Sequence, residues 1–246
     1  MEINKKQKID TFRKKLLKSK TVGGWLQLSD PNIARIVSRS KNLDWLCLDM
    51  EHGLINLSSI PNILNAVELS KKIILARISY SDIKDIPKIL DLGIDGIIIA
   101  NIKKEQDILK INNVSNYPPF GERGMGFSRY NNFSLNKKDL KIKPILIPMI
   151  ENLSAYKNLE KILKYRKLFD GLFVGPVDFS LSIGDNLEFS KNHKNKISNI
   201  RKLSKINKVP MGLHIIKGDK KDIDKAFKND VNFVAYLTDT VVLQSY

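Results

Sequence analysis

Residues 43–53 read LDWLCLDMEHG and join an apolar run to a group of charged side chains. A short, uninterrupted apolar run is typical of a parallel strand that helices cover on its outer face. The same pattern recurs in IDGIIIA (94–100) and FDGLFVG (169–175), so Asp44, Asp95 and Asp170 each lie just ahead of a run. Each aspartate also follows a helical stretch. The three therefore mark the same corner between a helix and a strand.

Eight such runs alternate with amphipathic helical stretches along the chain. The runs cover residues 22–28, 45–50, 73–78, 96–100, 145–150, 171–175, 210–215 and 233–236. Helical patterns cover residues 31–40, 58–69, 83–92, 104–111, 155–163, 190–205 and 219–227. This alternation predicts an α/β fold, a (β/α)8 TIM barrel, rather than a doubly wound sheet. No linker divides residues 1–246, so we expect one barrel domain with a basic amphipathic helix at about residues 4–19.

The composition is that of an ordinary globular protein. The chain has 246 residues, of which 42% are hydrophobic, and barrels of about 250 residues form one domain. No apolar run approaches the roughly 18 to 20 residues that span a bilayer, and the N-terminus has no apolar signal core. Cys47 is the single cysteine and lies within a strand, where we expect a core residue rather than a nucleophile. These features predict a cytoplasmic protein with no membrane partner.

The formal net charge of +16 raises the question of nucleic acid. The densest basic run, from Lys5 to Lys20, also contains Ile9, Phe12, Leu16 and Leu17 on one helix face. A solvated helix face accounts for such a run. Exposed aromatic residues interleaved with basic ones, as single-strand binders use, are not apparent. Nucleic acid is therefore not expected as a partner.

Polar residues follow the predicted strands where a barrel builds its active site, at their C-terminal ends. They are Asp49, Glu51 and His52 after the second run, Arg77 in the third, Glu151 after the fifth and Asp178 after the sixth. Any one of them could be a capping or ion-pairing residue. Their convergence on one rim indicates a site.

Glu151 and Asp178 lie on neighbouring strands and are candidate metal ligands. Carboxylates with open positions suit Mg²⁺ or Mn²⁺. The same pair could instead serve as an acid and a base, as in glycosidases. No spacing typical of a zinc site is present.

The other candidates each have a structural alternative. His52 follows acids at a strand end and is a candidate general base, whereas His193 is expected to face solvent and His214 to pack in the core. Arg77 could grip a carboxylate or pair with Glu51 or Asp49. Asp91 could orient His52 or end its own helix.

The segment 112–136 is rich in Pro, Gly, Asn and Ser. A connection of this length in a compact domain is usually functional. It follows a helix rather than a strand, so a place at the mouth of the barrel is not automatic.

Taken together, several stretches resemble the HpcH/HpaI aldolases, a family of metal-dependent pyruvate aldolases with a TIM barrel of the phosphoenolpyruvate/pyruvate type. They are LDWLCLDMEHG, ILARISYSD, LDLGIDGIII, YPPFGERGMGFSR, MIENLSAYKNLEKI and FDGLFVGPVDFSLSIG. The resemblance extends from Phe12 to about Leu243. It implies reversible aldol cleavage of a 4-hydroxy-2-oxo acid to pyruvate, or a related 2-oxo acid, and an aldehyde.

The resemblance also implies roles for single residues. Glu151 and Asp178 correspond to the metal carboxylates, for Mg²⁺ or Mn²⁺ in the first place and Co²⁺ or Zn²⁺ otherwise. The other matches are Arg77 for the pyruvate oxygens, His52 for the catalytic histidine, Asp91 for its aspartate partner, Asp49 for the acid that precedes the histidine, and Gly175 and Pro176 for residues flanking the pyruvate. Family members form homo-oligomers, usually trimers or hexamers that exchange the last helix.

This chain departs from the family pattern at Met149, Ala100 and Leu237, where the family commonly has glutamine, proline and glycine. Three alternatives stay open. A Schiff-base aldolase would need a lysine such as Lys217. A lyase on the same fold could act on coenzyme A thioesters. The chain could also be a basic binding protein without catalysis.

Overall fold

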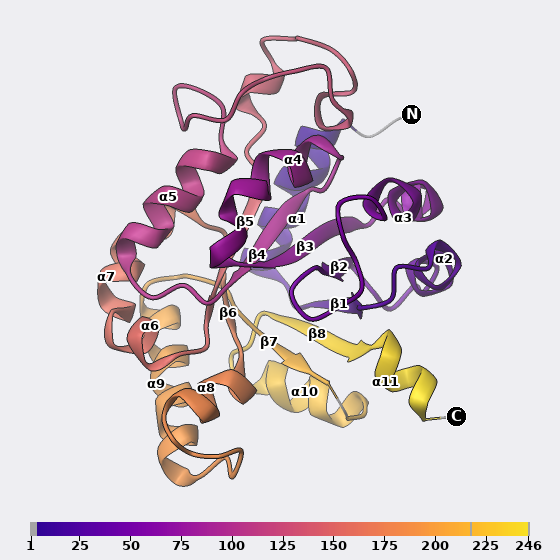
Figure 1. Ribbon diagram of the computed structural model, residues 1–246. Helices are drawn as coiled ribbons and strands as arrows, with labels where there is room; N and C mark the ends of the chain where they lie inside the picture. The colour runs from indigo at the N-terminus through magenta and orange to yellow at the C-terminus, as the bar shows by residue number, and fades with distance from the viewer. Residues whose placement is uncertain (1–3, 217, 246) are drawn as a thin grey trace.

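The computed structural model describes residues 4–216 and 218–245, and in that part eight parallel strands close into a barrel (Figure 1). The strands are β1 (Thr21–Leu26), β2 (Trp45–Asp49), β3 (Ile73–Ser79), β4 (Gly96–Ala100), β5 (Ile145–Ile150), β6 (Leu172–Val174), β7 (Met211–Ile215) and β8 (Phe233–Thr238). Each strand pairs with the next one in the chain, and β8 pairs with β1. The predicted TIM barrel is confirmed.

Helices surround the barrel on its outside (Figure 1). They are α1 (Lys5–Lys18), α2 (Pro31–Ser38), α3 (Ile60–Val67), α4 (Ile86–Asp91), α5 (Glu105–Ser115), α6 (Leu153–Lys157), α7 (Leu159–Lys164), α8 (Pro176–Ser182), α9 (Lys191–Ile206), α10 (Lys220–Lys228) and α11 (Asp239–Gln244). Within the described residues, no helix is both long and apolar enough to cross a membrane.

All eight predicted strands are present, with ends that differ by a few residues. The helices differ more. The single helix predicted at 155–163 is divided into α6 and α7 at Asn158. The sequence pattern did not reveal α8, which has 7 residues, because so short a helix shows no clear helical period. Its Pro at the first position and Asp178 in the first turn are the start signals that were available.

Helix α1 closes the N-terminal end of the barrel. Ile9, Phe12 and Leu16 are buried beneath it, whereas Leu17 is 61% exposed, so its predicted place on the buried face is wrong. The prediction that the basic face of α1 is solvated holds for only part of that face. Part of it is fastened to the barrel by ion pairs with the three corner aspartates: Lys15 with Asp44, Lys8 with Asp95 at 2.6 Å, and Arg13 with Asp170 at 2.7 Å.

The corner recurs at all four even-numbered strands. At each corner a side-chain oxygen accepts the backbone N–H of a residue at the start of the preceding strand. The pairs are Val22 to Asp44 at 2.9 Å, Ile74 to Asp95 at 2.9 Å, Leu146 to Asp170 at 3.0 Å and Met211 to Asn232 at 3.0 Å. The fourth corner therefore has the same geometry as the others but no charge.

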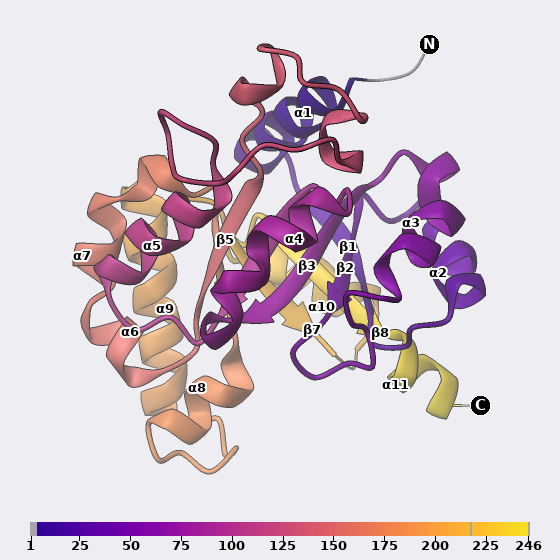
Figure 2. The ribbon, with the colours of Figure 1, turned by 45° about the horizontal axis from the view of Figure 1, so that its top comes forward.

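The long connection between α5 and β5 lies beside α1 at this same end (Figures 1 and 2). Its Arg123 is buried between the rings of Tyr117 and Tyr130, at 4.7 and 4.4 Å from their centroids, and donates a hydrogen bond to Asp91 at 2.6 Å. The segment predicted to be functional thus packs at the end opposite the C-terminal mouth of its own barrel.

Candidate active site

An ion pair between neighbouring strands forms the centre of the C-terminal mouth. Asp49 ends β2 and lies directly opposite Arg77 of β3. Arg77 donates to the two carboxylate oxygens from Nε at 2.9 Å and from Nη2 at 2.5 Å. Its Nη1 lies 3.3 Å from Glu51 Oε2. This two-point contact fixes the plane of the guanidinium.

Asp49 is fully buried and ionised. Burial alone would raise the pKa of Asp49, but the hydrogen bonds and charge of Arg77 lower it to about 2. Asp49 also accepts hydrogen bonds from the indole N–H of Trp25 at 3.1 Å and from the backbone N–H groups of Glu51 at 3.2 Å and His52 at 3.1 Å. Asp49 therefore stays an anion at neutral pH and holds Arg77 in one orientation.

Glu151 follows β5 and is buried with one oxygen unused. Its Oε1 accepts the backbone N–H of Asn101 at 2.5 Å. Asn101 has a φ of +60°, a left-handed conformation that asparagine tolerates better than most residues. Oε2 is buried and has no hydrogen-bond partner within the described residues. Burial raises the pKa of Glu151 to about 7, and the negative charges of Glu51 and Asp178 raise it further. The hydrogen bond from the Asn101 N–H has the opposite effect and lowers this pKa.

Gly175 and α8 bring Asp178 to Glu151. Asp178 is exposed in the first turn of α8. A Cβ at Gly175 would lie 2.7 Å from Glu151 Oε2, so only glycine leaves room for that carboxylate. Pro176 begins α8, and its carbonyl oxygen lies 3.0 Å from His193 Nε2.

His193 is buried, so the prediction that it faces solvent is wrong. Its ring packs against Phe179 and Phe189 beneath α8. The lysines around His193 in the sequence lie on the other faces of α9. They therefore gave no sign that the face carrying His193 packs against α8. His193 therefore supports the helix that carries Asp178.

These residues fit a divalent cation. Glu151 offers an unpartnered oxygen, and burial, more than the nearby charges of Glu51 and Asp178, raises its pKa; a bound cation would offset both effects. Carboxylate oxygens with free positions are the ligands of Mg²⁺ and Mn²⁺. In residues 4–216 and 218–245, no three His, Cys, Asp or Glu side chains come together closely enough to surround a metal ion. The chain itself therefore offers two carboxylates, and the remaining positions would fall to other ligands.

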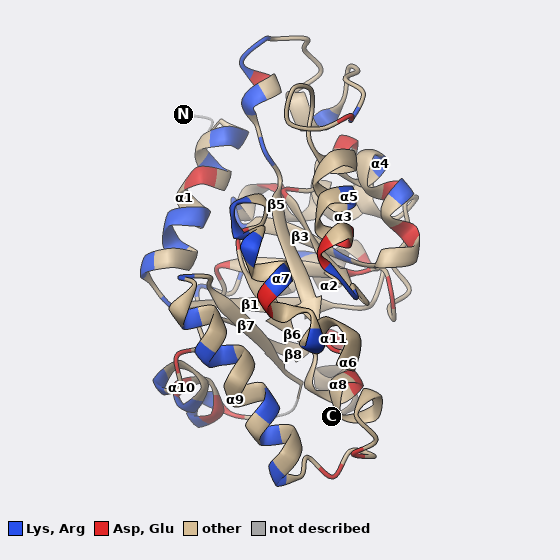
Figure 3. Ribbon diagram, turned by 90° about the vertical axis from the view of Figure 1, so that its left-hand side faces the viewer, with Lys and Arg blue, Asp and Glu red and all other residues tan. Residues whose placement is uncertain are grey.

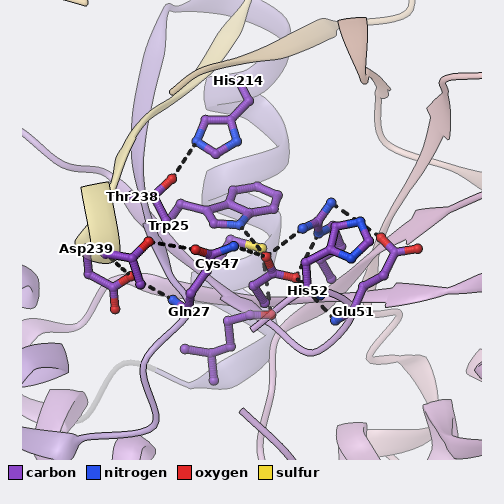
Figure 4. Close-up of polar contacts among 12 residues, drawn as sticks. Trp25, Gln27, Cys47, Glu51, His52, His214, Thr238 and Asp239 are labelled. Carbon is purple, nitrogen blue, oxygen red and sulfur yellow. Dashed lines mark hydrogen bonds and ion pairs between the residues drawn. The ribbon is translucent and has the colours of Figure 1, made fainter. Parts of the chain in front are cut away.

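His52 and Asp91 lie at different ends of the barrel. His52 is exposed at the mouth beside Glu51 (Figure 4). Asp91 ends α4, the helix that leads away from the mouth toward the start of β4, and its carboxylate binds Arg123. The predicted pair between Asp91 and His52 is therefore not formed within one chain, because the direction of α4 separates them.

The profile of the HpcH/HpaI aldolase/citrate lyase family matches residues 21–241. The chain belongs to this family, whose members are aldolases and lyases. A 4-hydroxy-2-oxovalerate aldolase from Novosphingobium aromaticivorans is 32% identical over 167 residues, which cover 66% of this chain and 63% of the relative. The aligned part thus spans less than two thirds of that relative's length.

Two further proteins are similar to this chain. A hydroxypyruvate/pyruvate aldolase from Roseobacter denitrificans is 28% identical over 182 residues, 72% of this chain and 70% of the relative. The crystal structure of an HpcH/HpaI aldolase/citrate lyase family protein from Burkholderia cenocepacia superimposes with a TM-score of 0.87 at 20% identity, covering 96% of this chain and 95% of the other. This second likeness shows the shared fold.

In this HpcH/HpaI barrel, sequence reasoning missed the residues that support Asp49 from β1. Gln27 donates from Nε2 to Asp49 at 3.2 Å, and its Oε1 accepts the hydroxyl of Thr240 at 2.7 Å. Asp239 accepts the backbone N–H groups of Gln27 at 2.9 Å and Leu28 at 3.0 Å. The sequence did offer one signal for this contact, because Gln27 is a polar residue directly after the first strand. Its partners from α11 were not visible in sequence.

His214 lies at the mouth rather than deep in the core. It is half-buried, and its ring lies beside that of Trp25, with the two centroids 4.7 Å apart (Figure 4). Its Nε2 lies 3.2 Å from the Leu237 carbonyl oxygen. Burial lowers the pKa of His214 to about 4. It is therefore neutral at physiological pH.

The three departures from the family pattern lie near the same mouth. Met149 and Ala100 are buried near the ends of β5 and β4. Leu237 has a φ of +58°, so the backbone keeps a conformation that favours glycine although the residue is leucine. Cys47 is buried in β2, and burial raises the pKa of its thiol well above the usual value, which agrees with a core role. Lys217, the Schiff-base candidate, lies outside the described residues.

Proposed function

We propose that this protein catalyses the reversible aldol cleavage of a 4-hydroxy-2-oxo acid to pyruvate, or a closely related 2-oxo acid, and an aldehyde. The observation that carries the proposal is the placing of two groups at one mouth. Arg77 is held rigidly by Asp49, and Glu151 keeps a buried, unpartnered oxygen. Family relatives named as aldolases of 2-oxo acids support this substrate class.

Glu151 and Asp178 would hold the divalent metal, with Mg²⁺ or Mn²⁺ as the first choice and Co²⁺ or Zn²⁺ as alternatives. When bound, such a cation would supply Lewis-acid polarisation of the 2-oxo acid. Gly175 and Pro176 border the space next to Glu151, and we place the substrate's carboxylate there.

The protein's own residues would perform the remaining steps. Arg77 presents fixed N–H groups to the C2 oxygen of the substrate and stabilises the negative charge that develops as the C3–C4 bond breaks. Asp49 keeps Arg77 in place. His52 takes the proton of the C4 hydroxyl during cleavage and returns it during synthesis.

We further propose that the protein is a homo-oligomer, a trimer or a hexamer. Asp91 and His52 cannot meet within one chain, so their implied pairing requires a second copy. An apolar cavity of about 700 Å³ also lies outside β8 and β1, between α2 and α10, and Val242 and Leu243 of α11 line it. Light scattering coupled to size-exclusion chromatography tests this, and a monomer at micromolar concentration would contradict it.

The proposed chemistry is tested by deuterium exchange at the methyl group of pyruvate, followed by NMR with and without Mg²⁺, Mn²⁺ or Co²⁺. Exchange should need the metal and should disappear in Glu151→Gln. Glu160→Gln, on the exposed side of α7, removes the same charge away from the mouth and should leave exchange unchanged. Metal-independent exchange, or full exchange in Glu151→Gln, would count against the assignment.

A further inference from the structure

The fourth corner of the barrel lies in a cavity of about 730 Å³ at the N-terminal end. At three corners, an aspartate is neutralised by a basic side chain of α1. At the fourth, Asn232 accepts the Met211 N–H with the same geometry but brings no charge. The cavity around it is formed by the end of α1, by α9 and α10, and by the segments that lead into β7 and β8.

Basic side chains surround this cavity. Of the residues that the structure describes, one acidic residue, Asp230, lines the cavity together with six cationic ones: Lys18, Lys20, Arg201, Lys205, Lys208 and Lys228. In the whole chain, 42 Lys and Arg residues accompany 26 Asp and Glu residues, so the excess of basic residues is much smaller. Figure 3 shows Lys and Arg along α1, α9 and α10 on this side of the molecule. The general lysine content therefore does not account for the excess here.

Asp230 cannot balance these charges. It forms one ion pair, with Lys205 at 2.9 Å. Its pKa is lowered first by that hydrogen bond and then by the charges of Lys205, Arg201 and Lys20, so these cations converge on one point. Among the described residues, Lys18, Lys208 and Lys228 form no ion pair. Like charges gathered in this way repel one another unless an anion lies between them.

The floor of the cavity differs from its rim. Val209, Pro210 and Met211 are buried along it, and Phe227 forms a wall with Lys20 5.4 Å from its ring. Ser204 is buried there too, and its hydroxyl has no hydrogen-bond partner within the part of the chain that the structure describes. A cationic rim over an apolar floor suits a ligand with several negative charges and an apolar or aromatic body.

We propose that this cavity binds a small organic polyanion, a phosphate-bearing molecule of nucleotide size. The volume of the cavity lies within the range of roughly 300–1,000 Å³ that is typical of small-molecule sites. The anion takes the place of the carboxylate that Asn232 lacks. The cations line a bounded cavity rather than a stripe with exposed aromatic residues, which favours a small molecule over single-stranded nucleic acid.

The test is calorimetric titration of the metal-free protein with ATP and, separately, with inorganic triphosphate, at two salt concentrations. One saturable site that weakens with salt is expected, and excess pyruvate should not displace the ligand. Asn232→Asp supplies the missing carboxylate and keeps the acceptor for the Met211 N–H. It should weaken ATP binding about tenfold, because an internal anion then competes for the same cations. Asn195→Asp, exposed on α9, changes the net charge equally and should leave the affinity unchanged.

A second pair of variants tests the same cavity without changing Asn232. Lys208→Glu should weaken binding more than Asn232→Asp, whereas Lys161→Glu, exposed on α7, should not weaken it, with thermal unfolding confirming that both fold. ATP should bind more tightly than inorganic triphosphate, because its organic part can pack on the apolar floor, and equal affinities would count against an organic ligand. The proposal is overturned if neither anion saturates, if the control variants lose as much affinity, or if a single-stranded oligonucleotide binds more tightly than ATP.

Discussion

Two buried carboxylates, one at each end of this barrel, lie in opposite environments. At the N-terminal end, Asp95 is buried and bound by both Lys5 at 3.1 Å and Lys8 at 2.6 Å, and it also accepts the Ile74 N–H. At the C-terminal end, Glu151 is also buried, but its Oε2 has no hydrogen-bond partner among the described residues. The pKa values follow the same division, since that of Asp95 is lowered against burial and that of Glu151 is raised to about 7.

The difference teaches which end serves stability and which serves function. A buried carboxylate whose partners are all present holds the structure together, and removing one partner is costly. A buried carboxylate without a partner lowers stability and persists where a ligand completes it. The comparison therefore predicts that changes to Glu151 and to Arg77 beside it chiefly reduce activity, whereas changes to Asp95 and its partners chiefly reduce stability.

The largest effect is expected at the mouth, from Arg77→Lys. Lysine keeps the charge but cannot contact both oxygens of Asp49 and also face the substrate. Metal-dependent exchange at the pyruvate methyl group should fall by about 10²- to 10³-fold, as when one donor to a developing anion is lost. The free energy of unfolding should fall by less than the roughly 3–4 kcal/mol to which that rate loss corresponds, because lysine keeps a positive charge beside the buried Asp49. A variant that retains full exchange would break the comparison at its functional end.

At the closed end, Asp95→Asn should lower the free energy of unfolding by about 3 kcal/mol, because Lys5 and Lys8, whose side chains are only 17% and 24% exposed, lose the charge with which they pair. Exchange per folded molecule should remain near that of the parent. Urea unfolding measures the first quantity and NMR the second.

The control for this change is Asp230→Asn. It removes an exposed ion pair whose side chains are 68% and 54% accessible, and it should cost less than about 1 kcal/mol. If the two variants were equally stable, burial would not explain the role of the corner aspartates.

The sequence predicted the fold well because its signals are local. Each apolar run and each corner aspartate is read within about ten residues, and strand order then follows from the chain's alternation. The topology also brought Asp49, Arg77, Glu151 and Asp178 to one rim. These predictions needed no knowledge of side-chain direction.

Contacts between distant segments could not be predicted in this way. Thr240 meets Gln27 only after the barrel has closed from β8 to β1. The burial of His193 depends on which side of α9 faces α8. Asp91 illustrates the opposite case, because the direction of its helix already placed it at the closed end, away from His52.

A smaller effect is expected from His214, with a defined pH dependence. Its pKa in the folded protein is about 4, below the usual value of 6.5. The neutral form is thus favoured by folding, so its contribution to stability is full above pH 6.5 and is lost as the pH falls toward 4. Between pH 7 and pH 5, the free energy of unfolding of His214→Gln should therefore fall by about 1–2 kcal/mol less than that of the parent protein. Urea unfolding at both pH values measures it, and identical pH slopes for the two proteins would contradict it.

The smallest effect sharpens the comparison within the mouth itself. Thr240→Val removes the hydroxyl that anchors Gln27, so that the amide supporting Asp49 is held less firmly. A lost hydrogen bond of about 1 kcal/mol corresponds to roughly a fivefold fall in the exchange rate, through a less well-placed Arg77. The rate at saturating pyruvate should fall more than the apparent affinity, since no group that touches pyruvate is removed.

Thr240→Ser keeps the hydroxyl and should restore the rate, which a general loosening of α11 would not do. Gln27→Leu combined with Thr240→Val should be no slower than Gln27→Leu alone, because the two side chains act through one contact. If the two effects instead add in full, Thr240 influences the mouth by another route. The link from α11 to Arg77 would then run through the Asp239 contacts with the β1 backbone.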